Sequence, residues 1–400
     1  MIVTKHKPEL MAPAGDFTML RTVVQNGADA VYLGIENLNM RVKAANFTIE
    51  NLGEIVEYCS EHKVAVYITL NTILKPGEIQ KAEEIVIASK RSGVAMVICW
   101  DPAVIMLCKQ HEMPFCISTQ ASVANVQSAL FYQTLGAKRI VPARECSLEE
   151  IREIKQNTQL EIETFVHGAM CIAVSGRCFM SHEIFKKSGN QGECLQPCRR
   201  EYKITDKDSG FEMVLGEDYV LSAKDMNTLP ILDRLIDAGI DSFKIEGRKR
   251  SPEYAGKVTK IYREAIDSIF DGTWNEEVIS KLNDELSLVY NRGYSDGFYL
   301  GDPDENDFAT SGGNESPVKK KYVGKVLDYY KKAQVAFITC EANEIKTGDT
   351  IVIMGPTSGV IEHVLTGIRV NDMDGDEAPK GSKVTFPFPI LVRPNDKVYK

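Results

Sequence analysis

The sequence predicts an α/β protein: a (β/α)8 TIM-like barrel with a cysteine-rich insertion after strand seven, plus a small C-terminal β-barrel. Three observations carry this prediction. Strand-like and helix-like segments alternate strictly over the first 165 residues, an eighth unit follows a long interruption, and helical patterns stop beyond residue 321. Alternation implies parallel strands with right-handed crossovers. Eight such units favour a closed barrel over an open sheet.

Seven strands are expected before residue 166, each a short run of mainly apolar residues. They are Glu9–Ala12, Ala30–Gly34, Val64–Leu70, Ala95–Cys99, Phe115–Ser118, Arg139–Val141 and Leu160–Phe165. Amphipathic stretches lie between them, and several end in a glycine turn of the kind that favours a left-handed cap. These helices are Phe17–Asn26, Ile49–Glu61, Glu78–Ser92, Pro102–His111, Asn125–Leu135 and Leu148–Gln156.

The unit after strand seven is interrupted by a segment rich in Cys, Gly and Arg, at about 167–222. A helical stretch, Lys224–Gly239, the eighth strand, Ser242–Glu246, and the helix Pro252–Phe270 then complete the barrel. Strand-to-helix loops of such barrels lie on the catalytic face. The insertion is therefore expected where the chemistry occurs.

Three regions follow from these patterns. Residues 1–300 are expected to form the catalytic barrel, and the polar run 301–321 reads as a linker. Residues 322–400 change to short strands and turns, which predicts the small β-barrel. The Lys319–Lys321 run inside the linker is more typical of a solvated segment than of an RNA contact.

Composition is that of an ordinary globular protein, with 44% hydrophobic and 26% charged residues. The start of the chain has no long apolar run, and no stretch is apolar enough to cross a bilayer, so a cytoplasmic location without a membrane is expected. The net charge of −9 argues weakly against a protein that coats nucleic acid. Residues 171–203, however, hold six Lys or Arg against three Glu, which is compatible with local RNA recognition. Oligomeric state is not indicated.

Four of the ten cysteines fall close together, with the spacing C-x6-C-x15-C-x3-C. They are Cys171, Cys178, Cys194 and Cys198. Four thiolates can hold tetrahedral zinc or an iron–sulfur cluster, and both stay open from the residues, as do four unrelated thiols. Paired zinc knuckles usually have shorter spacings than C-x6-C, so the first interval suits a larger inorganic core. The other six cysteines are expected to be small buried residues.

Charged side chains near the expected strand ends are the other site candidates. On a period-two strand, Glu163 and Phe165 share a face and His167 follows at the strand exit. Glu163 and His167 are expected either to handle substrate or protons beside the cysteines or to orient the cysteine loop. Asn71, Gln120 and Arg144 close strands three, five and six in a similar way.

Basic residues supply a second set of candidates. Arg177, Arg199 and Arg200 could hold a phosphate or a dicarboxylate, although Arg199 could equally offset the charge of a cluster. Lys244, Glu246 and Arg248 mark the end of strand eight on the active face; a strand-end salt-bridge network is the alternative for these three.

Eight ordered motifs resemble the collagenase-like peptidase family U-32, over about residues 1–270. They are Leu10–Gly15, Gly27–Gly34, Glu163–Cys171, Ser175–Ser181, Gly192–Cys194, Gln196–Arg199, Leu221–Asp225 and Asp241–Arg248. The terminal domain is similar to the C-terminal domain of that family. Length and the terminal domain favour its branch that hydroxylates the wobble uridine of tRNA to 5-hydroxyuridine.

The resemblance implies an oxygen-independent hydroxylase that carries a [4Fe-4S] cluster and uses prephenate as co-substrate, with tRNA and an electron donor as partners. The four cysteines would hold the cluster. From their positions and chemistry rather than from the resemblance, Glu163, His167 and Glu246 are the candidate catalytic residues, and Arg177, Arg199, Lys244 and Arg248 are the candidates for binding the co-substrate or cluster.

Three other functions stay open: a collagenase-like peptidase, a hydroxylase of ribosomal RNA or of a ubiquinone precursor, and a non-catalytic RNA-binding protein with structural zinc. The peptidase has no visible mechanism, because the chain lacks an H-E-x-x-H helix and a G-x-S-x-G elbow.

Overall fold

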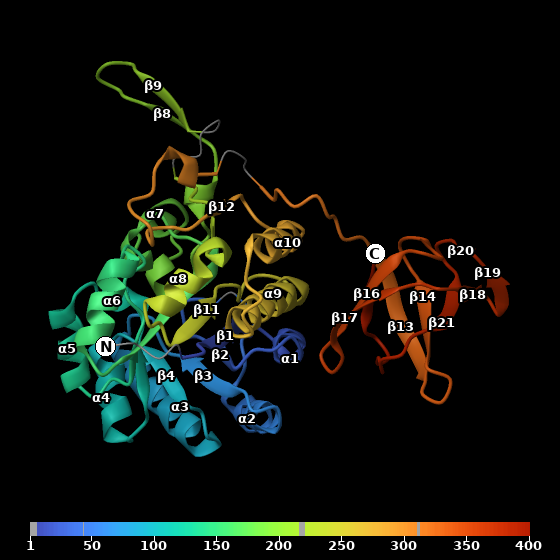
Figure 1. Cartoon of the computed structure of the whole chain (residues 1–400), viewed down its shortest axis with the longest axis horizontal. Coiled ribbons are helices and arrows are strands. Elements are labelled where there is room, and N and C mark those ends of the chain that lie inside the picture. The colour runs from blue at the N-terminus through green and yellow to red at the C-terminus, as the bar shows by residue number, and fades with distance from the viewer. Residues whose placement is uncertain (1–5, 43, 216–220, 310–312) are drawn as a thin grey trace.

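In a computed structural model that describes residues 6–42, 44–215, 221–309 and 313–400, eight parallel strands close a barrel surrounded by helices (Figure 1). The last strand pairs with both the first and the seventh, which closes the ring and confirms the predicted fold class. The barrel strands are β1 Glu9–Pro13, β2 Ala30–Gly34, β3 Ala65–Thr69, β4 Met96–Cys99, β5 Phe115–Ile117, β6 Arg139–Ile140, β7 Glu161–Ala169 and β11 Ser242–Ile245.

The outer helices begin where the sequence places polar caps. Asp16 accepts a hydrogen bond from the Met19 amide at 2.8 Å, and Ser147 forms a capping box with Glu150. Gly93 ends one helix in the left-handed conformation. The helices are α1 Phe17–Gln25, α2 Leu52–Glu61, α3 Ile79–Ser92, α4 Pro102–Gln110, α5 Val126–Thr134, α6 Leu148–Asn157, α9 Pro252–Phe270 and α10 Glu276–Ser287.

Two apolar layers stabilise the barrel. The larger layer fills the space between the strands and the outer helices, while a smaller cluster around Met11, Tyr32 and Tyr67 fills the barrel interior. The interior is therefore packed at its lower end, and the chemistry is confined to the open upper end.

The helix expected over Lys224–Gly239 is wrong in its first half. A short strand, β10 (Asp225–Asn227), pairs antiparallel with the end of β7, and only Leu232–Asp237 is α-helical (α8), after a 3-10 turn. Pro230 lies in that turn and disfavours helix at Leu229 before it, so the α-helix begins later. A further strand, β12 (Tyr294–Ser295), pairs with β10.

The cysteine-rich insertion lies above the barrel in Figure 1. It consists of short turns, one helix, and a two-stranded hairpin that projects beyond the rest of the domain (Figure 1). Its elements are the 3-10 turns Val174–Gly176, Gly189–Gln191 and Pro197–Arg199, the helix α7 Met180–Phe185, and the strands β8 Tyr202–Thr205 and β9 Glu212–Leu215. The part of the predicted insertion at 216–220 lies outside the described residues.

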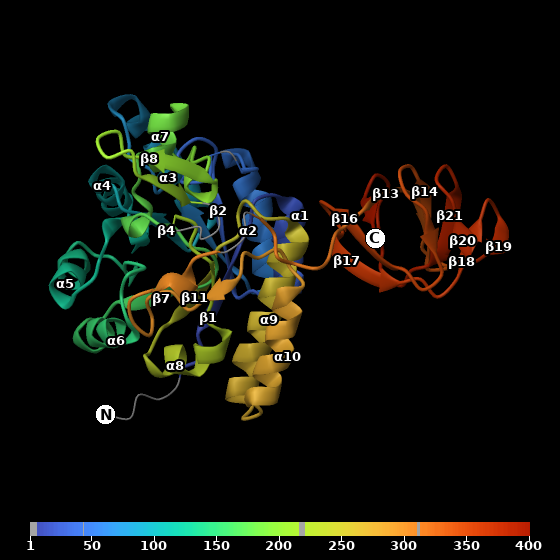
Figure 2. The ribbon, with the colours of Figure 1, turned by 90° about the horizontal axis from the view of Figure 1, so that it is seen from above.

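The C-terminal domain is an antiparallel sheet of eight strands that curves around its own apolar core (Figure 2). Within 322–400, its two edge strands do not pair with each other, so the hydrogen-bonded ring is left open. A separate two-stranded sheet joins β15 Ile345–Lys346 and β20 Glu377–Ala378. In order along the main sheet, the strands are β17 Gly359–Val364, β16 Thr350–Gly355, β22 Lys397–Tyr399, β13 Tyr322–Tyr330, β14 Val335–Cys340, β21 Lys383–Pro387, β18 Ile368–Val370 and β19 Met373–Gly375.

The two domains meet at α1 and β17. The Arg21 side chain donates from Nε to the Pro356 carbonyl at 2.9 Å. In the predicted linker, 310–312 lies outside the described residues, and Phe308 forms an antiparallel bridge with Ala223 of the barrel domain. Among the described residues, no helix is both long enough and apolar enough to cross a membrane.

Candidate active site at the mouth of the barrel

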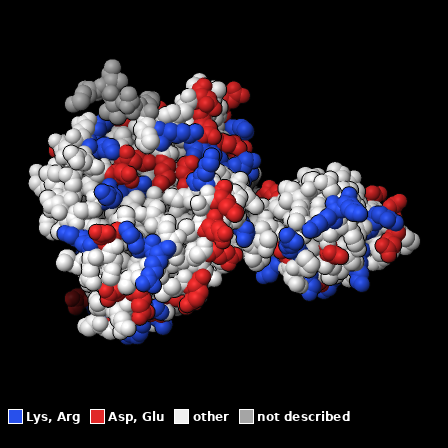
Figure 3. All heavy atoms as spheres, turned by 90° about the horizontal axis from the view of Figure 1, so that it is seen from below, with Lys and Arg blue, Asp and Glu red and all other residues white. Residues whose placement is uncertain are grey.

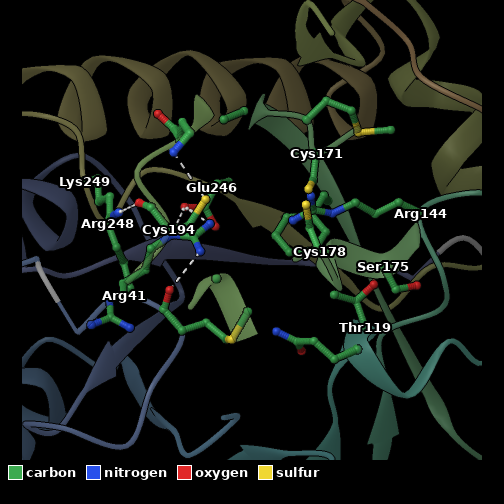
Figure 4. A pocket seen from close by; sticks show the side chains of 18 of the residues that line it. Arg41, Thr119, Arg144, Cys171, Ser175, Cys178, Cys194, Glu246, Arg248 and Lys249 are labelled. Atoms are coloured by element: carbon green, nitrogen blue, oxygen red, sulfur yellow. Dashed lines mark hydrogen bonds and ion pairs between the residues drawn. The ribbon is translucent and has the colours of Figure 1, made fainter. Parts of the chain in front are cut away.

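A cavity opens at the carboxyl ends of the barrel strands, and all four clustered cysteines line it. In Figure 4, Cys171 and Cys178 reach the cavity from one side and Cys194 from the side of Glu246. These thiols are free and partly exposed, whereas the six scattered cysteines are free and buried. The four cysteines that are close in the sequence thus line the cavity, whereas the six scattered cysteines are buried.

Backbone amides point at two of the sulfurs. The Met180 amide donates to Cys178 Sγ and the Gln196 amide donates to Cys194 Sγ, each at 3.3 Å. Hydrogen bonds of this kind favour a thiolate over a neutral thiol. Across the described residues, no three side chains of the His, Cys, Asp and Glu types are arranged to hold a single metal ion.

Burial raises the pKa of the Cys198 thiol, the neighbouring Arg199 guanidinium lowers it, and the other three clustered cysteines raise it further. Cys198 is therefore close enough to the other three clustered cysteines for their negative charge, as thiolates, to disfavour its own ionisation. A cationic centre among them would offset that negative charge.

Glu246 enters the cavity at the exit of β11, as predicted. Its carboxylate forms an ion pair with Arg41, with 3.1 Å between Nη2 and Oε1. Burial alone would raise the pKa of Glu246, but Arg41, Arg144 and Arg248 together hold it below its ordinary value. Glu246 is thus an anion among three guanidinium groups.

Glu163 does not line the cavity. It lies in the barrel interior with no exposed side-chain surface, where Oε1 accepts from Lys244 Nζ at 2.7 Å and Oε2 pairs with Arg139 Nη1 at 3.2 Å. Lys244 itself does reach the cavity and lies 4.5 Å from the centre of the Tyr32 ring. Glu163 thus contacts neither the cavity nor the cysteine loop that it was expected to orient, and the side chain that it positions is Lys244.

His167 also lies away from the cavity, contrary to its predicted place beside the cysteines. The β7–β11 register shifts between Lys244 and Ile245, so that Val166 is an extra residue and His167 turns outward. There its ring is surrounded by Tyr254, Tyr262 and Tyr294, at centroid distances of 5.5 to 6.0 Å. Burial lowers the pKa of His167 to about 4, so the ring is neutral at pH 7.

Three predicted arginines differ in position. Arg177 is exposed and outside the cavity lining, where Nη2 donates to Ser122 Oγ at 2.9 Å. Arg199 lines the cavity, but its donors are used by the Met170 and Ala223 carbonyls, at 2.7 and 3.0 Å. Arg199 therefore joins the insertion to the ends of β7 and β10, while Arg200 is exposed and packs over the Phe185 ring.

Arg248 is buried at the cavity wall. Its Nη1 donates to Asn39 and Thr69 at 3.0 and 3.1 Å, and its Nη2 donates to Asn46 at 2.5 Å. Burial lowers its pKa to about 10. These bonds hold the loop after β2 against the exit of β11.

Arg144 is the cavity guanidinium with most of its donors available. It stacks over Phe165 at 4.4 Å, and among the described residues it makes no ion pair within 4.0 Å. Asn71 and Gln120, the other expected strand-end residues, also line the cavity. The three residues predicted to close strands three, five and six therefore line the same cavity.

Sequence reasoning missed Arg41 and the group around Asp225. Arg41 comes from the loop after β2, and its only signal was a basic residue in a loop on the catalytic face. Asp225 is buried behind the cavity and pairs with Arg250 and Arg292. The sequence placed Asp225 in a predicted helix, so its ion pairs with the two arginines could not be anticipated.

Comparison with known proteins decides the family: the model for Peptidase family U32 matches residues 15–309. The chain belongs to this family. An uncharacterized protease of Methanocaldococcus jannaschii is 41% identical, with 98% of this chain and 97% of the relative covered. A collagenase of Porphyromonas gingivalis is 37% identical at the same coverage. The tRNA hydroxylation protein P1 of Bacillus subtilis is 35% identical, with 94% and 89% covered.

Proposed function

We propose that this U32 protein is an RNA hydroxylase that converts the wobble uridine of tRNA to 5-hydroxyuridine. In this proposal it uses a [4Fe-4S] cluster held by the four clustered cysteines and prephenate as co-substrate. One observation carries the proposal: the four free cysteines line the same cavity as Arg144, Lys244 and the Arg41–Glu246 pair. A redox centre and a site for an anion would then share one chamber.

Four thiolates are a suitable donor set for an iron–sulfur cluster, and structural zinc is the alternative. A four-iron core is larger and accepts thiolates that stand further apart. Amide hydrogen bonds to Cys178 and Cys194 are of the kind that tunes such clusters. When bound, the cluster would supply electron transfer next to the substrate.

Prephenate carries two carboxylates, and the cavity offers cations for them. Arg144 has no acidic partner within 4.0 Å among the described residues, so its planar donors suit a bidentate carboxylate. Lys244, held by Glu163, would supply a second charge in a fixed position. Glu246 would stay ionised because of Arg41, and its negative charge would keep a dianion on the Arg144 side.

The choice of RNA rests on relatives of similar length. The Bacillus subtilis protein named for tRNA hydroxylation shares both domains with this chain, because the alignment covers 94% of it.

Anaerobic purification followed by visible absorption and iron analysis tests the cluster. The expected result is a brown protein with about four irons per chain. Cys194→Ser should lose the colour, whereas Cys340→Ser, at a buried cysteine of the C-terminal domain, should keep it. A colourless anaerobic protein that contains zinc would contradict the proposal.

Nucleoside mass spectrometry of tRNA tests the substrate. Deleting the gene should remove nucleosides that derive from 5-hydroxyuridine, and the wild-type gene should restore them. Cys194→Ser and Arg144→Gln should fail to restore them. Unchanged tRNA nucleosides in a strain without a second U32 gene would refute the tRNA assignment.

A peptidase is the second candidate, because two relatives carry protease names. The described residues that line the cavity include no histidine, so none of the cavity cysteines has a histidine base there. Proteolysis by protein in which all four cysteines are replaced by serine would favour this candidate.

A further inference from the structure

The outer side of the cysteine insertion exposes large apolar side chains around the cavity mouth. Residues that line the cavity alternate here with residues that face outward: Ser175, Gly176, Cys178, Met180 and Ser181 line it. Between them, Val174 and Phe179 are 61% and 76% exposed. We call the outward set Val174, Arg177, Phe179, Ile184 and Arg200 the rim surface.

Exposed apolar groups of this size indicate a binding surface. Phe179 has the largest exposed fraction among the exposed large hydrophobic side chains of the described residues. Packing in a core does not explain why this exposed position holds a phenylalanine. Its neighbours in the chain, Cys178 and Met180, both line the cavity, so Phe179 lies beside it. A partner that covers the rim surface would therefore also approach the cysteines.

Charge favours a nucleic acid as that partner. Residues 171–203 carry six Lys or Arg against three Glu, whereas the whole chain carries 47 Lys or Arg against 56 Asp or Glu. Arg177 and Arg200 are exposed, and neither has a carboxylate within 4.0 Å among the described residues. On the face in Figure 3, by contrast, positive and negative side chains are intermingled.

Flat aromatic side chains with adjacent arginines are the usual platform for unpaired bases. Every base has a face that stacks, and the arginines reach phosphates on either side. Arg200 packs on Phe185 and Arg177 lies 6.0 Å from the Trp100 ring, so both guanidinium groups are held in place.

We infer that the rim surface binds a single-stranded RNA loop, with an unpaired base next to the target nucleotide stacked on Phe179 and flanking phosphates on Arg177 and Arg200. The inference rests on the proposed function and adds the surface that recognises the RNA. It commits to unpaired RNA, because a duplex offers no free base face to Phe179.

Equilibrium binding by the full-length, anaerobically purified protein tests this inference. The probes are a stem–loop RNA with a uridine in its loop and a fully paired RNA of the same length. Phe179→Ser should weaken stem–loop binding about tenfold and leave duplex binding unchanged. Phe179→Trp should keep the affinity, and Phe131→Ser, at an α5 side chain that is 58% exposed, should also keep it. Iron content should be equal in all variants.

Salt titration gives an independent readout. Arg177→Gln should reduce the dependence of the logarithm of affinity on the logarithm of salt by about one unit, because one phosphate contact is lost. Equal affinity of wild type and Phe179→Ser for the stem–loop would overturn the inference. So would equal losses for the Ser and Trp variants, or a change of oligomeric state without a change in RNA binding. A wild type that binds neither RNA would defeat the proposed function itself.

Discussion

Glu163 illustrates how a buried charged residue can position a cavity side chain without lining the cavity itself. Both carboxylate oxygens are bound, one by Lys244 and the other by Arg139. Burial would raise the pKa of Glu163, but the two cations outweigh burial and hold it below its ordinary value. Its charge is thus present in the folded protein at neutral pH and fixes the Lys244 ammonium at the cavity.

Glu163→Ala should lower the free energy of unfolding by about 3–5 kcal/mol at pH 7, because two buried cations lose their partner. The pKa is lowered on folding, so the pair stabilises above the unfolded carboxyl pKa and is lost as pH falls through the folded value. The difference between wild type and variant should therefore stay constant from pH 7 to about pH 4.5 and shrink between pH 4.5 and pH 3. Urea unfolding at pH 7 and pH 3 measures it, and Glu183→Ala, at an exposed acid of α7, is the control. An equal difference at the two values would contradict the ion-pair account.

His167 is a buried neutral ring, not a proton carrier of the cavity. Its folded pKa of about 4 lies below the ordinary histidine value, so the unfolded chain takes up the proton first as pH falls. Stability from this residue is complete above about pH 6.5 and is lost progressively toward pH 4. His167→Phe should flatten the fall of melting temperature over that range, whereas His62→Gln, at an exposed histidine, should not. Activity whose pH dependence includes a histidine-like transition that is lost in His167→Phe would contradict this placement.

At the scale of elements, the sequence predicted the eight barrel strands but not their irregularities. Period-two reasoning put Glu163 and Phe165 on the same face correctly and misplaced His167, because one extra residue at Val166 shifts the register. The bulge depends on pairing between β7 and β11, which lie far apart in the sequence. The strand β10 was missed for the same reason: its hydrogen bonds go to β7, and local propensity does not reveal such a partner.

At Gly168, the end of β7 passes close to the exit of β11. This glycine has a positive φ of 105°, and a Cβ there would lie 2.3 Å from the Glu246 carbonyl oxygen. Gly168→Ala should therefore displace the exit of β11 together with the loop of Cys171, lowering both melting temperature and iron content. Gly136→Ala, with φ of 95° and open space around it, should cost only about 1 kcal/mol and keep the iron. Differential scanning calorimetry and iron analysis compare the two; equal losses would show that only the backbone angle matters.

The cysteine site was predictable for a different reason. Its four members lie within one segment, so spacing alone grouped them, and the structure brings them to one cavity. Arg41 and Arg144 come from other loops, and only closure of the barrel brings them to the same place. Sequence therefore grouped the four thiols, while the cationic side chains of the cavity were brought together only by the fold.

At the scale of the whole molecule, the chain has separate apolar cores in its two domains. Their contact through α1 and β17 includes the bond from Arg21 to Pro356 but is small beside either core. Interfaces of this kind permit domains to unfold independently. The four clustered cysteines all lie in the barrel domain, so only the barrel transition should release a cluster that they hold.

Two matched core substitutions test this independence. Leu33→Ala in β2 and Ile353→Ala in β16 remove side chains with no exposed surface, and each should cost about 2–5 kcal/mol in its own domain. Calorimetry of the holoprotein should show two transitions, with Leu33→Ala lowering only the one that coincides with loss of visible absorption. Ile353→Ala should lower only the other, because its core does not include the four clustered cysteines. If either substitution moved both transitions equally, the α1–β17 contact would couple the domains into one cooperative unit, and the C-terminal domain would then act on the cavity through α1.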